Sequence, residues 1–189
     1  MQRTPWLRAG EAVDRLVVMA NLSLPLLFML ALSACMAWVV VSDASRYIIS
    51  NRLNMVLLGL YVVAVIALPI HGWLWALAAA ALVLVAGLAL FSLGLMGGGD
   101  IKLLVVLSLW TGWGMPTWQF LFLTAVCGGV LVVLVLLARL VLPPLLFKLN
   151  PTRNIPRLLV RKQPVPYGIA IAAAFAWLLW MGGIAGLHA

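Results

Sequence analysis

Long runs of apolar residues, broken by short polar or Gly- and Pro-containing stretches, follow one another along this chain. Six runs are predicted to form helices, at residues 22–42, 53–70, 73–95, 101–115, 117–142 and 166–187. A helix of about 20 apolar residues crosses the roughly 30 Å of hydrocarbon in a bilayer. Backbone exposed to lipid must satisfy its polar groups internally, as helices do. The pattern therefore predicts an all-α integral membrane protein, a bundle of about six transmembrane helices.

The composition supports this fold class and divides the chain in two. Hydrophobic residues make up 66% of the 189 residues and charged residues only 8%, a balance that excludes an ordinary soluble domain. The polar segment 1–21 is expected to precede a single transmembrane domain at residues 22–189. The two cysteines lie in separate apolar runs and outside any C-x-x-C pair, so neither a zinc site nor a disulfide framework is predicted.

The basic residues predict which way the bundle faces. Most of the 12 Lys and Arg residues lie in the connections between runs one and two, three and four, and five and six. Alternating spans place these connections on one face, which the positive-inside rule makes cytoplasmic. This distribution argues against a nucleic-acid partner. Tryptophans at the other ends of the runs predict an aromatic belt on the opposite face: Trp73, Trp75, Trp110, Trp113, Trp118, Trp177 and Trp180.

Two carboxylates stand out because acidic residues are so scarce. Of the four, only Asp43 and Asp100 lie beyond the N-terminal segment; they follow the first predicted span and precede the fourth, at the same membrane boundary. One interpretation is structural: Asp100 caps a helix and Asp43 pairs with Arg46. The other is an aspartic protease dyad, in which two carboxylates share a proton, one activating water while the other donates.

The glycines before Asp100 and the position of the histidines bear on this choice. Gly97, Gly98 and Gly99 would let an extended substrate backbone approach, although they also suit a flexible turn. His71 and His188 map to the opposite face, so Ser-His-Asp catalysis is not supported. Two aspartates alone are a poor ligand set for a hydrolytic metal, and no metal site is predicted.

Three segments resemble, in order, motifs of the type IV prepilin peptidase family. They are DASRYIISNRLN from Asp43, GGGD ending at Asp100, which fits the family's G-x-G-D motif, and VPYGIAIAAAF from Val165. The first resembles the small branch associated with Flp (tight adherence) pili, in which Ile-Pro-Asn follows the aspartate at this spacing. Here the three positions are Ile49, Ser50 and Asn51, with serine in place of proline.

The resemblance implies an aspartic endopeptidase of the bacterial inner membrane with Asp43 and Asp100 as its catalytic pair. Such an enzyme removes the basic leader of prepilins or pseudopilins at the cytoplasmic face. Larger members carry a four-cysteine domain and N-methylate the product; this chain lacks those cysteines and a long first loop, so no cofactor is expected. The candidate substrate-binding residues are Gly97, Gly98, Gly99, Asn51, Pro166, Tyr167 and Gly168. Pro166 and Asn51 equally suit a purely structural role at the start of a helix.

Three alternatives remain open at this point. A G-x-G-D protease similar to the presenilins and signal peptide peptidases would cut within a transmembrane helix, but its aspartates are expected deeper inside the spans. A small transporter would use the carboxylates to relay protons or bind cations. A pilus-assembly scaffold would have no activity. The separation of the two carboxylates distinguishes a dyad from two independent helix caps.

Overall fold

The structure, a computed structural model, describes residues 5–68, 70–149, 165–184 and 187, with side chains described from residue 23 to 141 and from 165 onwards within these ranges. The basic connection 150–164 and Arg3 lie outside them. The described residues form six helices and no strand: α1 (Pro5–Arg46), α2 (Asn51–Ala67), α3 (Trp73–Ser92), α4 (Gly98–Thr111), α5 (Met115–Leu149) and α6 (Tyr167–Trp180).

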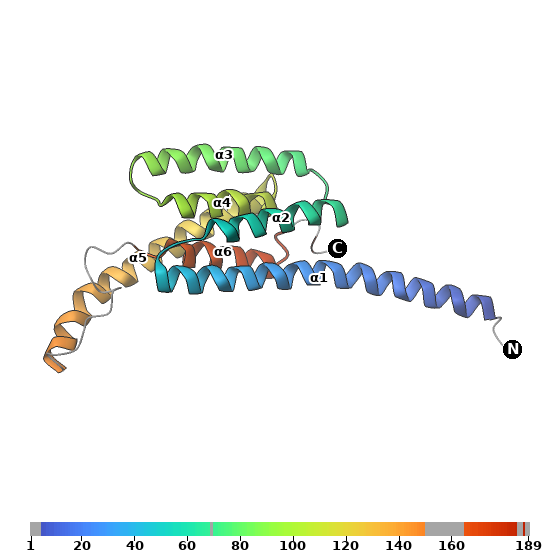
Figure 1. Cartoon of the computed structure of the whole chain (residues 1–189), viewed down its shortest axis with the longest axis horizontal. Helices are drawn as coiled ribbons and strands as arrows, with labels where there is room; N and C mark the ends of the chain where they lie inside the picture. The colour runs from blue at the N-terminus through green and yellow to red at the C-terminus, as the bar shows by residue number, and fades with distance from the viewer. Residues whose placement is uncertain (1–4, 69, 150–164, 185–186, 188–189) are drawn as a thin grey trace.

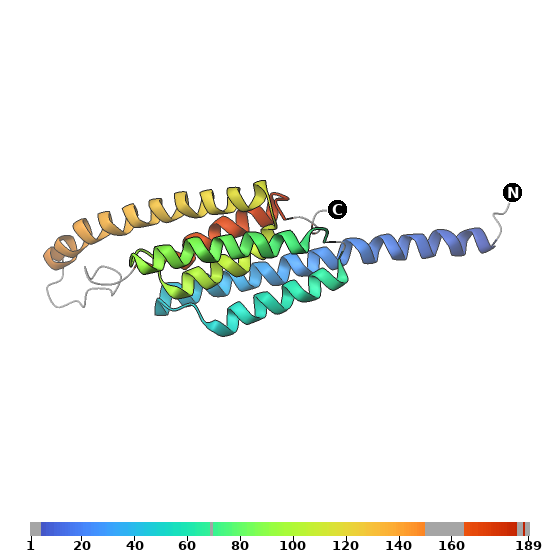
Figure 2. The same ribbon diagram turned by 90° about the horizontal axis from the view of Figure 1, so that it is seen from above.

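The helices run roughly parallel or antiparallel to one another and form one elongated bundle (Figures 1 and 2). The α1–α2 and α3–α4 connections lie at one end of the bundle. The C-terminal end of α5 and the N-terminal end of α6 point toward that same end (Figure 1). The α2–α3 and α4–α5 connections lie at the other end. The chain segments that contain Asp43 and Asp100 therefore lie at the same end of the bundle.

Three helices contain a stretch long and apolar enough to cross a bilayer: Ser23–Arg46, Trp73–Ser92 and Met115–Val141. Helices α2 and α6 are shorter apolar helices. The predicted fold class, an all-α membrane protein, is confirmed. Some boundaries differ from the sequence-based expectation, because α1 begins at Pro5 and continues without a break into the first span. Alanine, leucine, arginine and glutamate in residues 6–20 all favour helix.

The two shortest helices lie at the centre of the bundle. Helix α4 contacts α2, α3, α5 and α6, and helix α6 contacts α1, α4 and α5. Each has 14 residues, and eight of them are buried. The outer helices instead leave many Leu, Val and Trp side chains exposed. In a bilayer this exposure is favourable, since lipid chains are as apolar as leucine.

Trp110 shows how a polar group of the central helix is satisfied. Its side chain is only 3% exposed, and its indole N–H donates to the carbonyl oxygen of Leu57 in α2 at 3.3 Å. Its ring packs edge-on against Tyr61, with 5.5 Å between centroids. The prediction that Trp110 belongs to an interfacial belt is therefore wrong, because its face of α4 points at α2. The other six tryptophans of the predicted belt are exposed.

A glycine in α3 brings that helix close to the start of α4. A Cβ atom at Gly87 would lie 2.7 Å from Cγ2 of Ile101, a distance that packed atoms do not tolerate. Small residues at helix–helix contacts allow such close approach in membrane proteins. Since Ile101 follows Asp100 directly, Gly87 helps to set the position of the Asp100 backbone.

Candidate active site

Asp43 lies in the last turn of α1 and turns its side chain into the bundle, where it is 4% exposed. The backbone N–H groups of Gly168 and Ile169, in the first turn of α6, donate to its carboxylate. Its Oδ2 atom is buried and has no hydrogen-bond partner among the described residues. Arg46 is exposed and is not one of the groups that act on Asp43. The structural interpretation of Asp43 as the partner of Arg46 is therefore wrong.

Gly168 lies directly against the Asp43 carboxylate. A Cβ atom at this position would lie 2.8 Å from Oδ2 and 3.0 Å from Cγ of Asp43, and 3.0 Å from Cδ1 of Ile49. Only glycine therefore leaves room for the carboxylate against the N-terminal end of α6. Backbone donors and the positive end of a helix dipole stabilise a negative charge placed there.

Asp100 lies in the first turn of α4, but it is not the N-cap residue. Gly97 occupies that position, with extended backbone angles of φ −77° and ψ 146°. The Asp100 carboxylate accepts a hydrogen bond from the backbone N–H of Gly97, as the third helical residue does in a capping box. The Asp100 carboxylate thus caps the first turn of α4 and also lines the adjacent cleft.

The electrostatics show that the two carboxylates are neighbours. Asp100 lies outside the three helical stretches able to cross a bilayer. Burial, and secondly the negative charge of Asp43, raise the pKa of the Asp100 carboxyl to about 6. Two carboxylates that repel each other in this way do not both ionise readily. Positions 43 and 100, far apart in sequence, therefore lie close together and line the same cleft.

The pair lies in a cleft of about 630 Å³ at the end of the bundle. Predicted residues that line it are Asp43, Asp100, Gly97, Gly98, Gly99, Asn51 and Tyr167. Gly168 lies behind Asp43, and Pro166 is a buried N-cap residue of α6, not a first-turn residue as expected. Asn51 begins α2 and also accepts a hydrogen bond from Nζ of Lys102, at 3.1 Å. Both suggested roles of Asn51 are thus compatible with its position.

Further residues that the sequence does not single out also line the cleft, among them Lys102, Ile49 and Tyr47. In the sequence, Lys102 is one of the basic residues that indicate topology, and Ile49 matches the family spacing after Asp43. Ile49 packs between the two active-site elements, because a Cβ at Gly99 or at Gly168 would come within 3.4 Å of its side chain. Tyr47 has a φ of 55° and is the one non-glycine residue with positive φ in the described chain. Such a conformation costs about 1–3 kcal/mol, and no local sequence signal predicts it for tyrosine.

The serine that replaces the family's proline has a clear structural role. Ser50 is the N-cap of α2, with φ −68° and ψ 133°, and its Oγ accepts a hydrogen bond from the backbone N–H of Arg52 at 3.2 Å. Proline prefers the same φ. Serine therefore keeps the backbone conformation and adds a cap, a common device at helix starts.

Residues 30–134 match the type IV leader peptidase family. The chain belongs to that family. The matched segment contains both aspartates and covers more than half of the chain, so this member of the leader peptidase family is a protease-like protein inserted in a membrane. No curated protein and no solved structure matches it.

The leader peptidase match ends before α6, although α6 completes the surroundings of Asp43. The contact between Gly168 and Asp43 is therefore a structural finding independent of the match. Within the described residues, no cluster of three or more His, Cys, Asp or Glu side chains forms a candidate metal site. The cleft offers two carboxylates, backbone N–H groups, the Asn51 amide, the Lys102 ammonium and the hydroxyl groups of two tyrosines, Tyr47 and Tyr167.

Proposed function

We propose that this leader peptidase is an aspartic endopeptidase that removes the basic leader from Flp-type prepilins or pseudopilins at the cytoplasmic face of the bacterial inner membrane. Asp43 and Asp100 are its catalytic pair, and the reaction involves no N-methylation. The observation that carries the proposal is the presence of these two carboxylates in one cleft, where the negative charge of Asp43 acts on Asp100. Two independent helix caps need not share a cleft.

The surroundings of the two carboxylates differ, and the difference supports an assignment of roles. Asp43 receives two backbone N–H groups, from Gly168 and Ile169 of α6, whereas Asp100 receives one, from Gly97. Hydrogen bonds from N–H groups stabilise the ionised form of a carboxylate. Asp43 is accordingly the ionised member of the pair, and Asp100 carries the shared proton.

These roles define the peptide cleavage step. Asp43 takes a proton from water as the water oxygen attacks the carbonyl carbon of the scissile bond, and Asp100 donates its proton to the carbonyl oxygen. When the tetrahedral intermediate collapses, the C–N bond breaks and the amine leaves with the proton that Asp43 had taken. Asp100 recovers its proton from the hydroxyl group, and the dyad returns to its starting state.

The cleft suits a substrate cut just before its hydrophobic segment. Both aspartates lie at helix ends, Asp43 in the last turn of α1 and Asp100 in the first turn of α4, whereas a protease that cuts inside a transmembrane helix is expected to hold them deeper. The three glycines leave one wall of the cleft without side chains. An extended substrate backbone can lie against such a wall.

The connection between α1 and α2 supports the choice of the small Flp-associated branch. Only residues 47–50 separate the two helices; this segment contains Ile49 and Ser50 of the motif match, and Asn51 begins α2. A cytoplasmic domain of the kind that larger members carry has no place in so short a connection. Proteolysis without methyl transfer follows from that difference.

The test uses membranes that contain the wild-type protein, Asp43→Asn or Asp100→Asn, mixed with a Flp-type prepilin. Mass spectrometry of the product reads leader removal and any added methyl group together. Asp14→Asn, which removes a carboxylate much earlier in α1, is the matched control. We expect both active-site variants to lose cleavage at normal protein levels and the control to keep it.

Other outcomes would overturn specific parts of this proposal. Cleavage that persists in either active-site variant would return that aspartate to a structural role. Cleavage within the hydrophobic segment would identify an intramembrane protease. A methylated product would contradict the assignment to a peptidase without transferase activity.

A further inference from the structure

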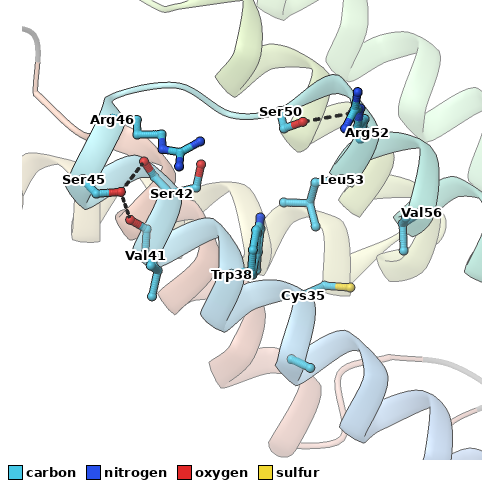
Figure 3. Close-up of a pocket in the computed structure, with 11 residues that line it drawn as sticks. Cys35, Trp38, Val41, Ser42, Ser45, Arg46, Ser50, Arg52, Leu53 and Val56 are labelled. Carbon is cyan, nitrogen blue, oxygen red and sulfur yellow. Dashed lines mark hydrogen bonds between the residues drawn. The ribbon is translucent and has the colours of Figure 1, made fainter.

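A second cavity, of about 620 Å³, lies between α1 and α2 and shares no lining residue with the active-site cleft. Figure 3 shows that its lining side chains come from the last turns of α1 and the first turns of α2. We call this cavity the α1–α2 groove. Its residues play no part in the peptidase chemistry proposed above.

The groove has a basic, hydroxyl-rich end and an apolar end. Arg46, Ser45 and Ser42 of α1 lie near the connection between the helices, as do Ser50 and Arg52 of α2 (Figure 3). Further along the two helices the lining becomes Trp38, Cys35, Leu53 and Val56. Trp38 and Val56 are 64% and 52% exposed, so the apolar part is open along the side of the bundle, where lipid chains lie.

The charges at the basic end have no counterpart within the described protein. Neither Arg46 nor Arg52 forms an ion pair with a described residue, and the two described carboxylates, Asp43 and Asp100, line the other cleft. The N-terminal end of α2 and the C-terminal end of α1 both border this region, so their partial charges oppose each other. The two guanidinium groups therefore supply the positive charge of a site for an anion.

The charge pattern distinguishes between possible occupants. The leader of the proposed substrate is basic and would be repelled by the two arginines. A free phosphate would leave the apolar part of the groove unused. An anionic lipid fits both halves, since its head group bears a negative charge and its acyl chains are apolar. Basic pockets between transmembrane helices on the cytoplasmic side bind such head groups.

We propose that the α1–α2 groove binds an anionic phospholipid. The phosphodiester group lies between Arg46 and Arg52, and one acyl chain follows Trp38 and Val56 along the helices. Because the groove joins the segment that carries Asp43 to the segment that carries Asn51, a bound lipid also ties together the two sides of the α1–α2 connection.

The test measures lipid binding to the full-length protein in detergent by native mass spectrometry. Phosphatidylglycerol and phosphatidylcholine with identical chains are titrated against wild type and against the double variant Arg46→Gln/Arg52→Gln. Each arginine near an anionic group contributes about fivefold in affinity, so we expect the double variant to bind phosphatidylglycerol about 25-fold more weakly. The phosphatidylcholine affinity should change little.

Matched variants separate the two halves of the groove. Arg139→Gln removes one basic side chain from α5, outside the groove, and should leave the lipid preference unchanged. Arg46→Lys/Arg52→Lys preserves charge and should stay within about fivefold of wild type. Val56→Trp fills the apolar part at an exposed position and should weaken both lipids. Circular dichroism and size-exclusion chromatography check that each variant is folded.

Several results would overturn the proposal. Equal binding of the two lipids to wild type, or unchanged phosphatidylglycerol binding in the arginine double variant, would remove the anionic site. Displacement of the lipid by glycerol phosphate at equal concentration would show that the acyl chain is not recognised. Displacement by a synthetic basic leader peptide would reassign the groove to substrate. If the glutamine variants do not fold, unchanged binding in Val56→Trp would be sufficient to reject it.

Discussion

The substitution Gly168→Ala tests the position of Asp43 more directly than removal of the carboxylate. The added Cβ would lie 2.8 Å from Oδ2 of Asp43, and ordinary contact begins at 3.4 Å, so the carboxylate must move by about 0.6 Å or more. Ile49 blocks one direction of movement, since its Cδ1 would be 3.0 Å from the same Cβ. The movement therefore carries the carboxylate away from the N-terminal end of α6.

The expected effect is kinetic, not a loss of fold. Displacement of a catalytic group by about 1 Å costs on the order of 100-fold in rate, which corresponds to about 2.7 kcal/mol of transition-state stabilisation. Alanine also has a better helix propensity than glycine by about 1 kcal/mol, which offsets part of the steric cost in α6. We expect kcat/KM for leader removal to fall about 100-fold at near-normal protein levels.

The assay is the same prepilin cleavage in membranes, followed over time at several substrate concentrations. Gly129→Ala is the matched control, because it makes the same change in α5 and its Cβ would meet no atom within 4 Å. Wild-type kinetics for Gly168→Ala would refute the inference that the Asp43 carboxylate must be held against α6. Equal loss in both variants would show that the effect is a general consequence of altered helices.

The remaining predictions concern pH, a buried amide and a helix contact. With a pKa of about 6, Asp100 loses its proton as pH rises through that value, so kcat/KM should fall above about pH 6 as the general acid disappears; a rate that is flat from about pH 5 to 8 would contradict this role. Asn54 is 5% exposed, and its amide atoms have no hydrogen-bond partner among the described residues. Asn54→Leu should therefore stabilise the protein by about 1 kcal/mol, measured as a higher unfolding midpoint in detergent. A lower midpoint would show that the amide has a partner. Gly87→Val should destabilise the bundle by about 1–3 kcal/mol through its clash with Ile101. Gly59→Val, where the added side chain would enter open space, is the control. Equal unfolding midpoints for the two variants would contradict close packing of α3 on α4.

Much of the candidate site follows from residues close together in sequence. Asp100 directly follows three glycines, and the first turn of α4 forms from that same segment. The spacing from Asp43 to Asn51 predicts a short connection, and Ser50 caps the following helix with its own side chain. These are local properties, because capping and turn formation depend on neighbouring residues.

Other parts of the site depend on contacts between distant segments. Nothing near Asp43 in the sequence indicates that Gly168 and Ile169 supply its hydrogen bonds, since α6 reaches it only through packing against α1. The hydrophobic periodicity of the sequence predicts neither the burial of Asn54 nor the left-handed conformation of Tyr47. Helices that are apolar on all sides carry little information about which face packs inward.

By itself, the sequence determined the membrane class, the approximate position of most of the described helices and the two acidic residues on which the proposed function rests. Apolar run length and charge scarcity are sufficient for these, because the bilayer accepts only long apolar helices and rejects isolated charges. Only the tertiary structure decided that Trp110 is a core residue, that Gly168 supports Asp43, and that Arg46 and Arg52 converge on one groove. Each of these features depends on which helix faces meet. Because lipid solvates every apolar helix face equally well, close packing between particular side chains decides which faces meet.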